Sequence, residues 1–245
     1  MQAIILAAGM GKRLKELTKN NTKCMVKVGG ITLIERLLKQ LEPYKLSRIV
    51  IVFGYKGKTL VDYVQSLNIQ TPVEFVENPI YEKTNNIYSL YLAKEYLAAE
   101  DTLLFESDLI FEDSVIQTVI NDSRPTLALV DKYQSWMDGT CVRLTAGDEI
   151  SEFIPGNKLC ASDAAHYYKT VNVYKFSKHF SKDYYIPSLE EYCTAYGLNE
   201  YYEQVLKVIV MLKSCELRAL RLSGQKWYEI DDAHDLAMAE SIFRG

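Results

Sequence analysis

MQAIILAAGMGKRL, residues 1–14, joins a short apolar run to a basic loop that contains two glycines. Residues 4–6 are β-prone and lie between small residues, which is typical of a central parallel strand that is covered on both faces. Gly9 and Gly11 lack a Cβ, so the backbone there can take a positive φ and approach a ligand closely. This pattern predicts a strand that ends in a ligand-binding loop.

The chemistry of this loop suits an anion. Consecutive backbone N–H groups can converge on phosphate oxygens, and Lys12 and Arg13 add positive charge. A Gly-x-Gly pair after a strand is weak evidence alone, because most such pairs are ordinary tight turns. The P-loop requires a Gly-Lys-Ser/Thr ending and the dinucleotide fingerprint requires a third glycine, where this chain has Leu14, so both are excluded. A triphosphate cradle and a plain turn remain.

The composition is that of a globular protein without overall affinity for polyanions. Of the 245 residues, 48% are apolar and 24% are charged, which suffices for a full core in one domain. The formal net charge is −4, so no global field favours nucleic acid or an anionic membrane. The cysteines are odd in number and widely spaced, so we expect neither disulfides nor a zinc site but reduced core thiols at Cys24, Cys141, Cys160, Cys193 and Cys215.

We expect a cytoplasmic protein that makes no membrane contact. The first strand pattern begins directly after Met1, which leaves no room for a signal peptide. No apolar run approaches the roughly 20 residues that a membrane span needs.

The first half alternates between strand and helix patterns. Apolar residues recur at helical spacing over residues 33–41, where Thr32 can cap the start and Pro43 ends the segment. Buried strand patterns occupy residues 48–53 and 72–76, with a second helix between them. This alternation predicts an α/β fold with a Rossmann-like, mostly parallel sheet flanked by helices, in which ligands bind at the carboxyl ends of the strands.

A polar segment, residues 78–90, runs into a helix that continues to Leu97. The amides and hydroxyls at the helix start could hydrogen-bond the edge of a base, and they would discriminate strongly because an unmatched buried polar group costs free energy. The alternative is that Thr84, Asn85 or Asn86 caps the helix.

The next buried strand, residues 102–108, ends in two carboxylates. Its carboxyl end places Asp108 at the same edge of the sheet as the Gly9 loop. Aspartate is a hard oxygen ligand that suits Mg²⁺, which takes only one or two protein carboxylates and fills its shell with phosphate oxygens and water. The alternative is an aspartate that starts a turn.

From Thr126 the pattern changes to short strands separated by Asp-Gly and Gly-Asp turns, which predicts a small antiparallel β appendage over the pocket. No linker or internal repeat follows, so we expect one domain, 1–245, with a first half of about 1–125 and a second half of about 126–245. We further expect an irregular loop at 156–165, a strand at 167–176, helices at 189–196 and 200–213, a strand at 217–222 and a closing helix. The apolar face of the helix at 200–213 predicts core packing or a contact in a homodimer.

Four stretches together resemble one enzyme family. Residues 6–14, followed by Lys23, resemble the signature of nucleotidylyltransferases, which join a nucleotide to a sugar phosphate or a small phosphorylated alcohol. NNIYSL at 85–90 and YEID at 228–231 resemble bacterial phosphocholine cytidylyltransferases, and ESD at 106–108 resembles phosphonate cytidylyltransferases. The resemblance implies a single nucleotidyltransferase domain, 1–245, with a glycosyltransferase-A-like fold. It also implies that the half of about 1–125 binds the nucleotide and that the half of about 126–245 binds the acceptor.

The resemblance also implies roles for individual residues. Asp108 and Asp231 would hold Mg²⁺, and Lys23 and Arg13 would act with them in catalysis. Lys23 could instead be a solvated surface lysine, and either Asp231 or Asp232 could cap a helix, so these two aspartates could exchange roles. The residues that would contact the nucleotide are Leu6, Ala8, Gly9, Gly11, Lys12, Arg13, Lys23, Tyr81, Thr84, Asn86, Ser89 and Glu106.

The implied reaction is transfer of CMP from CTP to a phosphorylated acceptor, with Mg²⁺ as cofactor. An oxygen of the acceptor attacks the α-phosphorus in line and pyrophosphate leaves, without a covalent enzyme intermediate. Because both reactants are anionic, the main catalytic task is to hold them together and offset their repulsion. The product would be a CDP-alcohol or CMP-phosphonate that decorates a surface polysaccharide or a lipid. Cys24 has no evident base partner, so we interpret it as a packing residue.

The expected acceptor is phosphocholine, phosphoethanolamine, another aminoalcohol phosphate or aminoethylphosphonate. An aromatic and acidic box could bind its ammonium group. The candidate residues are Trp136, Tyr168, Trp227 and Tyr228, with Asp138, Glu106 or Asp232, although 18 tyrosines make chance placement an alternative. Two other functions stay open: a sugar-1-phosphate nucleotidylyltransferase that uses UTP or dTTP, and a non-catalytic nucleotide sensor.

Overall fold

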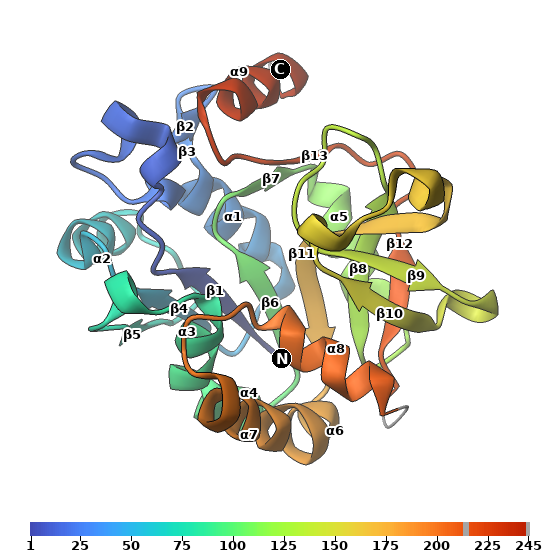
Figure 1. The fold of residues 1–245 in the computed structure, drawn as a ribbon. Helices are drawn as coiled ribbons and strands as arrows, with labels where there is room; N and C mark the ends of the chain where they lie inside the picture. Colours follow the sequence, from blue (N-terminus) through green and yellow to red (C-terminus); the bar gives the residue numbers. More distant parts are fainter. Residues whose placement is uncertain (213–215, 244–245) are drawn as a thin grey trace.

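A computed structural model of the chain describes residues 1–212 and 216–243, and Figure 1 shows its fold. The strands are β1 Gln2–Ala7, β2 Lys27–Val28, β3 Ile31–Thr32, β4 Ile49–Phe53, β5 Val73–Glu77, β6 Thr102–Glu106, β7 Leu109–Phe111, β8 Leu127–Lys132, β9 Cys141–Leu144, β10 Ile150–Ile154, β11 Tyr167–Phe176, β12 Arg218–Arg221 and β13 Trp227–Glu229. The α-helices are α1 Leu33–Leu41, α2 Gly57–Ser66, α3 Asn86–Leu92, α4 Lys94–Ala99, α5 Asp113–Asn121, α6 Lys178–Phe180, α7 Ile186–Tyr196, α8 Glu203–Met211 and α9 Ala233–Ile242.

Strand β1 lies in the middle of a mixed sheet. It pairs in parallel with β4 on one side and with β6 on the other, so that Ile4 lies between Val50 and Leu104. The sheet order is β10-β9-β11-β6-β1-β4-β5, and β8 pairs with both β11 and β12. The predicted central strand and the α/β class are therefore confirmed.

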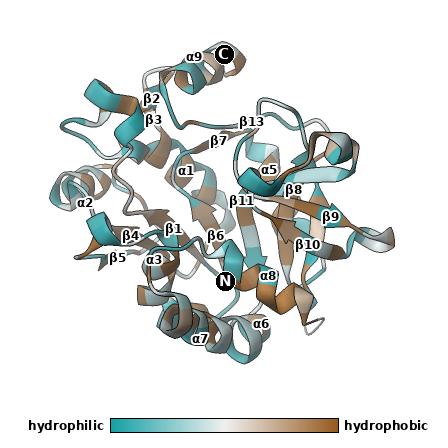
Figure 2. Cartoon of the chain, in the orientation of Figure 1, coloured by the Kyte–Doolittle hydropathy of each residue, from teal (hydrophilic) through white to brown (hydrophobic). Residues whose placement is uncertain are grey.

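The two faces of β1 belong to two different hydrophobic cores. Ile4 and Leu6 pack in one core beneath helices α3, α7 and α8, whereas Ile5 and Ala7 pack in the other beneath α1, α2 and α5. Alternate side chains of a strand point to opposite faces, and all six residues of β1 are buried. Figure 2 shows the resulting brown colour in β1, β4 and β8.

Local signals in the sequence set the helix ends. The side chain of Thr32 accepts a hydrogen bond from the Glu35 N–H at 3.1 Å and caps α1, and Pro43 lies in the short 3₁₀ turn that follows this helix. Asp232 caps α9 and forms a reciprocal capping box with Asp235. The N-terminus of α9 is thereby fixed directly after Asp231.

The predicted antiparallel strands after Thr126 are present, and they are continuous with the main sheet. β11 pairs antiparallel with β6 of the first half and also with β8 and β9, so it joins the two halves. The separate antiparallel sheets within the described residues are the two-stranded pairs β2–β3 and β7–β13.

Some predicted boundaries differ. The single helix expected to Leu97 is two helices, α3 and α4, which meet at Ala93. The helix expected at 189–196 begins earlier, because α6 and a π-helical turn over Ser181–Tyr185 precede α7. A π turn breaks the 3.6-residue period, so the burial of Phe180, Tyr185 and Leu189 gave no recognisable helical pattern.

The predicted apolar face of α8 is largely core. Of the residues on this predicted face, Tyr202, Val205, Leu206 and Ile209 are buried, whereas Leu212 is 70% exposed and lies outside the core. Lys213 lies outside the described residues.

Three of the predicted core thiols, Cys24, Cys141 and Cys193, are free and buried. Cys160 is free but exposed, because it lies between two 3₁₀ turns at the surface, and Cys215 lies outside the described residues. In the described part of the chain, no helix has the length and apolar character that a membrane span requires.

Candidate active site

A cavity of about 800 Å³ opens at the carboxyl end of β1. Both halves of the chain contribute to its walls, as expected for a ligand site in an α/β sheet. All twelve residues predicted to contact the nucleotide line it, together with both predicted metal ligands: Leu6, Ala8, Gly9, Gly11, Lys12, Arg13, Lys23, Tyr81, Thr84, Asn86, Ser89, Glu106, Asp108 and Asp231. The structure thus brings together residues that lie far apart in the sequence.

Gly11 is required where the glycine loop passes Lys23. It has a φ of 59°, and a Cβ on it would lie 3.0 Å from both Lys23 Cβ and Thr18 Cγ2. Its carbonyl accepts hydrogen bonds from the Leu14 N–H at 3.0 Å and from Thr18 Oγ1 at 2.9 Å. Gly9 differs, because no atom of residues 1–212 or 216–243 lies within 4 Å of the position its Cβ would take.

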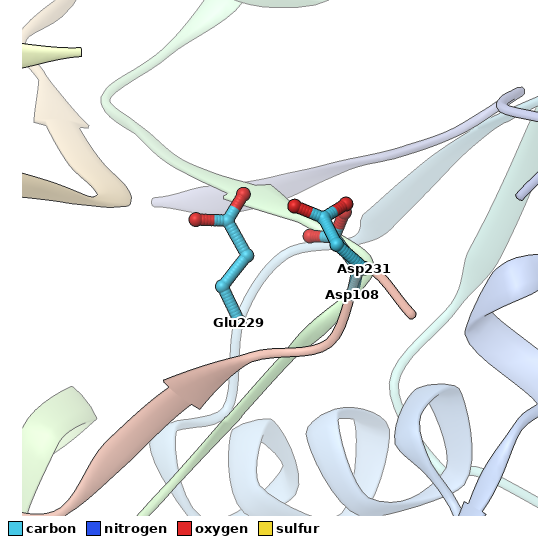
Figure 3. Close-up of side chains that lie close together, drawn as sticks. All are labelled: Asp108, Glu229 and Asp231. Carbon is cyan, nitrogen blue, oxygen red and sulfur yellow. The ribbon is translucent and has the colours of Figure 1, made fainter. Parts of the chain in front are cut away.

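Two short strands assemble the carboxylates of the site. β7 pairs antiparallel with β13, which sets Leu109 opposite Glu229, and the Ile230 N–H donates to the Asp108 carbonyl at 3.0 Å. Asp108 comes directly before β7 and Asp231 comes after β13, so the pairing holds them side by side (Figure 3). Carboxylate oxygens of Asp108, Glu229 and Asp231 all lie within 4.8 Å of one another.

Two cationic side chains offset this negative charge. The Lys23 ammonium donates to Asp108 and to Asp231 Oδ1, the latter at 2.6 Å, and Arg13 lies 2.7 Å from the same Asp231 oxygen. Burial alone would lower the pKa of Lys23, but the charges of both aspartates outweigh it and the pKa is raised. Burial would likewise raise the pKa of Asp231, but Lys23 and then Arg13 lower it. Lys23 is therefore protonated and Asp231 ionised near neutral pH.

The residues present fit a magnesium ion. Asp108 Oδ1 is buried and has no hydrogen-bond partner within the described residues, although Oδ2 of the same carboxylate accepts from Lys23. Mg²⁺ prefers carboxylate oxygens, and a buried acceptor without a donor is stabilised by a cation. Asp108 and Asp231 would hold the ion, with Glu229 as a third carboxylate within reach.

Glu229 is a member of the cluster to which sequence reasoning gave no role. Asn172 donates to its Oε1 at 3.2 Å, and the buried Lys169 ammonium lies 3.3 Å from its Oε2. Burial raises the pKa of Glu229. The charge of Lys169 offsets part of this increase, whereas the charges of Asp108 and Asp231 add to it. The predicted strand 167–176 contains polar residues, Lys169 and Asn172, that the structure buries. Their presence in a buried strand was the sequence signal that could have indicated a polar site there.

The start of α3 connects the first half to α8. Asn85 caps the helix, since its side chain accepts from the Asn86 N–H at 2.8 Å. The amide of Asn86 donates to Glu106 Oε1 at 2.8 Å and accepts from the Tyr202 N–H at 3.0 Å. Burial, the charge of Asp108 and then that of Glu203 raise the pKa of Glu106 well above its usual range.

The predicted aromatic box does not form in the described residues. Trp136, Tyr168, Trp227, Tyr228 and Asp232 are all absent from the cavity wall, whereas Asp138 and Glu106 line it. Trp227 is buried in the core and its indole N–H donates to Asp131 at 2.7 Å.

The remaining members of the box are engaged elsewhere. Tyr228 is buried beneath Trp136, and the two rings stack with centroids 4.8 Å apart. The ring of Tyr168 contacts the cations of Lys132 and Arg221, at 4.5 and 5.0 Å from its centroid. Asp232 accepts from the N–H groups of α9, so of its two predicted roles the cap is the one observed.

Comparison with known proteins shows similar enzymes. The chain is 26% identical over 99% of its length to CMP-5'-(3-aminopropyl)phosphonate synthase of Streptomyces rubellomurinus, and the match covers 39% of that protein. It is 32% identical over 56% of its length to CTP:phosphoglutamine cytidylyltransferase of Campylobacter jejuni, covering 54% of that protein. It is 43% identical over 40% of its length to choline-phosphate cytidylyltransferase of Streptococcus pneumoniae, covering 41% of that protein. The chain thus spans less than two thirds of the length of these curated relatives.

Solved structures show the same fold. CTP:phosphocholine cytidylyltransferase from Streptococcus pneumoniae superposes with a TM-score of 0.78 at 25% identity, over 99% of both chains. A UDP-glucose pyrophosphorylase superposes with a TM-score of 0.80 at 13% identity, over 99% of this chain and 97% of that one. Residues 3–175 match the family described as the MobA-like NTP transferase domain. Because this match includes more than half of the chain, the nucleotidyltransferase resemblance is confirmed, and the chain belongs to the MobA-like NTP transferase domain family.

Proposed function

We propose that this protein is a Mg²⁺-dependent cytidylyltransferase that transfers CMP from CTP to a small phosphorylated amino alcohol or aminoalkylphosphonate and releases pyrophosphate. The observation that carries the proposal is the cavity in which the glycine loop, Lys23 and the cluster of Asp108, Glu229 and Asp231 lie together. The choice of CTP and of the acceptor class is supported by relatives that are named for cytidylyl transfer to phosphonates and choline phosphate.

The residues of the loop bind and orient the triphosphate. Gly9 leaves room for the phosphates to approach the backbone, and Lys12 and Arg13 bring positive charge to the same wall. Lys23 is fixed by two carboxylates, so its ammonium is already in place when the nucleotide arrives. When bound, Mg²⁺ would supply the positive charge that draws the phosphates of both reactants together.

The acceptor enters from the side built by the second half of the chain. This wall contains Asp138–Thr140, Pro155–Lys158, Asn172 and Glu203. Lys158 provides a cation there for the acceptor phosphate or phosphonate. Because the cavity is continuous, an acceptor oxygen held on this side can face the α-phosphorus of a nucleotide held by the loop, which is the geometry that in-line attack needs.

The test is a substrate matrix. CTP, UTP, ATP, GTP and dTTP are each incubated with phosphocholine, phosphoethanolamine, 2-aminoethylphosphonate and glucose 1-phosphate, with and without Mg²⁺, and pyrophosphate is measured. We expect release with CTP, Mg²⁺ and an amino-alcohol phosphate or aminophosphonate. Turnover with glucose 1-phosphate alone would instead establish a sugar nucleotidylyltransferase. CTP binding without pyrophosphate release under any condition would establish a nucleotide sensor.

A further inference from the structure

Glu203, the first residue of α8, is a buried carboxylate with no assigned partner for one of its oxygens. Only 6% of the residue is exposed, yet it lines the cavity. Its Oε2 is buried and makes no hydrogen bond to any described residue. Leaving a buried carboxylate oxygen without a donor costs free energy, so a ligand group that donates to it is the expected compensation.

The start of α8 is held firmly in this position. The Tyr202 N–H donates to Asn86 at 3.0 Å, and the Ile87 N–H donates to the Glu200 carbonyl at 3.3 Å. Asn86 also binds Glu106 through its amide, so Glu106 and Glu203 approach the cavity from two fixed elements, β6 and α8. Asn86 thus holds the Glu106 carboxylate directly, and the contacts of Glu200 and Tyr202 fix the backbone from which Glu203 enters the cavity.

The acceptor side of the cavity carries an excess of negative charge. Its charged lining residues from the second half of the chain are Asp138, Lys158, Glu200, Glu203, Glu229 and Asp231. Lys169 is already paired with Glu229, and Lys23 and Arg13 with the aspartates. A phosphate or phosphonate acceptor with no positive group of its own would be repelled by this wall.

Burial raises the pKa of Glu203 to about 7. A cation beside Glu203 would favour the ionised carboxylate and offset the cost of burying its charge.

The other residues that line the cavity indicate which kind of cation fits. Quaternary ammonium groups have no N–H and are recognised by several aromatic faces. Tyr81 and Tyr201 are the aromatic residues among those that line the cavity, so the described residues form no aromatic cage.

We propose that the acceptor carries a primary ammonium group and that this group donates hydrogen bonds to Glu203, with Glu106 as the neighbouring carboxylate. A primary ammonium has three N–H donors, which satisfy carboxylate oxygens directly. This inference rests on the proposed function and narrows its acceptor class to primary amines on a short chain that ends in a phosphate or phosphonate.

The first experiment compares acceptors that differ at nitrogen alone. Pyrophosphate release with CTP and Mg²⁺ is measured for 2-aminoethylphosphonate, its N,N,N-trimethyl analogue and ethylphosphonate, and in parallel for phosphoethanolamine, phosphocholine and ethyl phosphate. We expect kcat/KM to fall at least about tenfold when the amine is trimethylated or removed, because a hydrogen bond to a charged group is lost. Equal or higher kcat/KM for the trimethyl acceptors would overturn the inference while leaving the proposed function intact.

The second experiment removes the carboxylate. Glu203→Gln keeps the shape of the side chain, and Glu191→Gln, an exposed glutamate on α7, is the matched control for the loss of one charge. We expect Glu203→Gln to lower kcat/KM for the amine acceptor by about tenfold or more, mainly through KM, and to lower it far less for ethylphosphonate or ethyl phosphate. An equal loss for all acceptors would show a structural role and overturn the inference. Absence of turnover with every acceptor in the native protein would overturn the proposed function and, with it, this inference.

Discussion

At the residue scale, Asp108 is the carboxylate on which the metal assignment most depends. Asp108→Ala removes the buried Oδ1, which has no donor among the residues that the structure describes, and it removes one of the two carboxylates that Lys23 binds. We expect pyrophosphate release to fall by about 10²- to 10³-fold, because the charge that organises the reacting phosphates is lost. Steady-state kinetics at saturating Mg²⁺ measures the loss.

The matched control for this variant is Asp62→Ala on the exposed face of α2, where Asp62 forms an ion pair with Lys58. This control is expected to keep native rates, since a surface ion pair contributes little. Circular dichroism should show that both variants are folded. Native rates in a folded Asp108→Ala variant would remove Asp108 from the metal site.

Lys23 offers a test of metal binding that needs no activity. Lys23→Gln leaves Asp108 and Asp231 side by side without the ammonium between them, so we expect a loss of about 2 to 3 kcal/mol of unfolding free energy in EDTA. Mg²⁺ should raise the Tm of this variant more than that of the native protein, because the ion no longer competes with the ammonium. If Mg²⁺ raised the Tm of both proteins equally, a metal site at Asp108 and Asp231 would be contradicted.

The stability of the native protein should depend on pH through Glu203. Its pKa of about 7 when folded exceeds the ordinary value of 4.5, so the folded state binds more protons between these pH values. Unfolding free energy therefore falls as pH rises from 5 to 8, by on the order of 3 kcal/mol from this residue. Glu203→Gln removes that part of the slope and is the more stable protein at pH 8.

Urea unfolding at pH 5 and pH 8 of the native protein and Glu203→Gln isolates this contribution, because the two share every other titrating group. The variant Glu191→Gln controls for the loss of an exposed glutamate. The same slope in the native protein and in Glu203→Gln would mean that Glu203 is not held in the buried position described.

Single residues of the site were predictable only where they belong to, or directly follow, a recognisable sequence motif. Lys23, Asp108 and Asp231 were found because each follows a recognisable stretch of sequence. Glu203 has no such neighbour, and its position in the cavity depends on how α8 is held against Asn86. Trp227 was misplaced for a related reason, since only the pairing of β13 with β7 decides that its ring enters the core.

At the scale of elements, the two glycines of the loop should respond differently to the same substitution. Gly11→Ala introduces a Cβ at positive φ that meets Lys23 and Thr18 at 3.0 Å, so we expect both stability and CTP turnover to fall. Gly9→Ala meets no protein atom within 4 Å but projects into the cavity, so we expect native stability with a raised KM for CTP. Thermal unfolding and CTP titration separate the two effects. Equal destabilisation by both variants would contradict the described loop.

Elements were predictable to the extent that their burial is periodic. The strands and helices of the first half follow from alternating apolar runs, since β1, β4 and β5 lie in parallel beneath helices. The π-helical turn at Ser181–Tyr185 has no such period, and the sequence does not show that β11 pairs with β6. Pairing between distant strands depends on the packed molecule rather than on either strand alone.

At the scale of the whole molecule, the two predicted halves share one sheet and both of the hydrophobic cores that cover it. β6 pairs with β11, and Leu104 of the first half packs in the same cluster as Tyr174 of the second. We therefore expect a single cooperative transition in calorimetry, with equal calorimetric and van't Hoff enthalpies. CTP should move the whole transition to higher temperature. Two transitions, of which CTP shifts one alone, would show that the halves are separate domains.

The pairing of β7 with β13 determines when the carboxylate cluster is assembled during synthesis on the ribosome. The glycine loop, Lys23 and Asp108 are synthesised in the first half of the chain, but Asp231 lies near the end of the second half, after β13. Until β13 has emerged and paired with β7, Lys23 lacks Asp231, the second of its two carboxylate partners. A nascent chain can thus form most of its sheet and still lack the complete cluster of Asp108, Glu229 and Asp231. The pairing of the last strand, β13, with β7 is therefore the step that brings Glu229 and Asp231 to Asp108 and completes the carboxylate cluster.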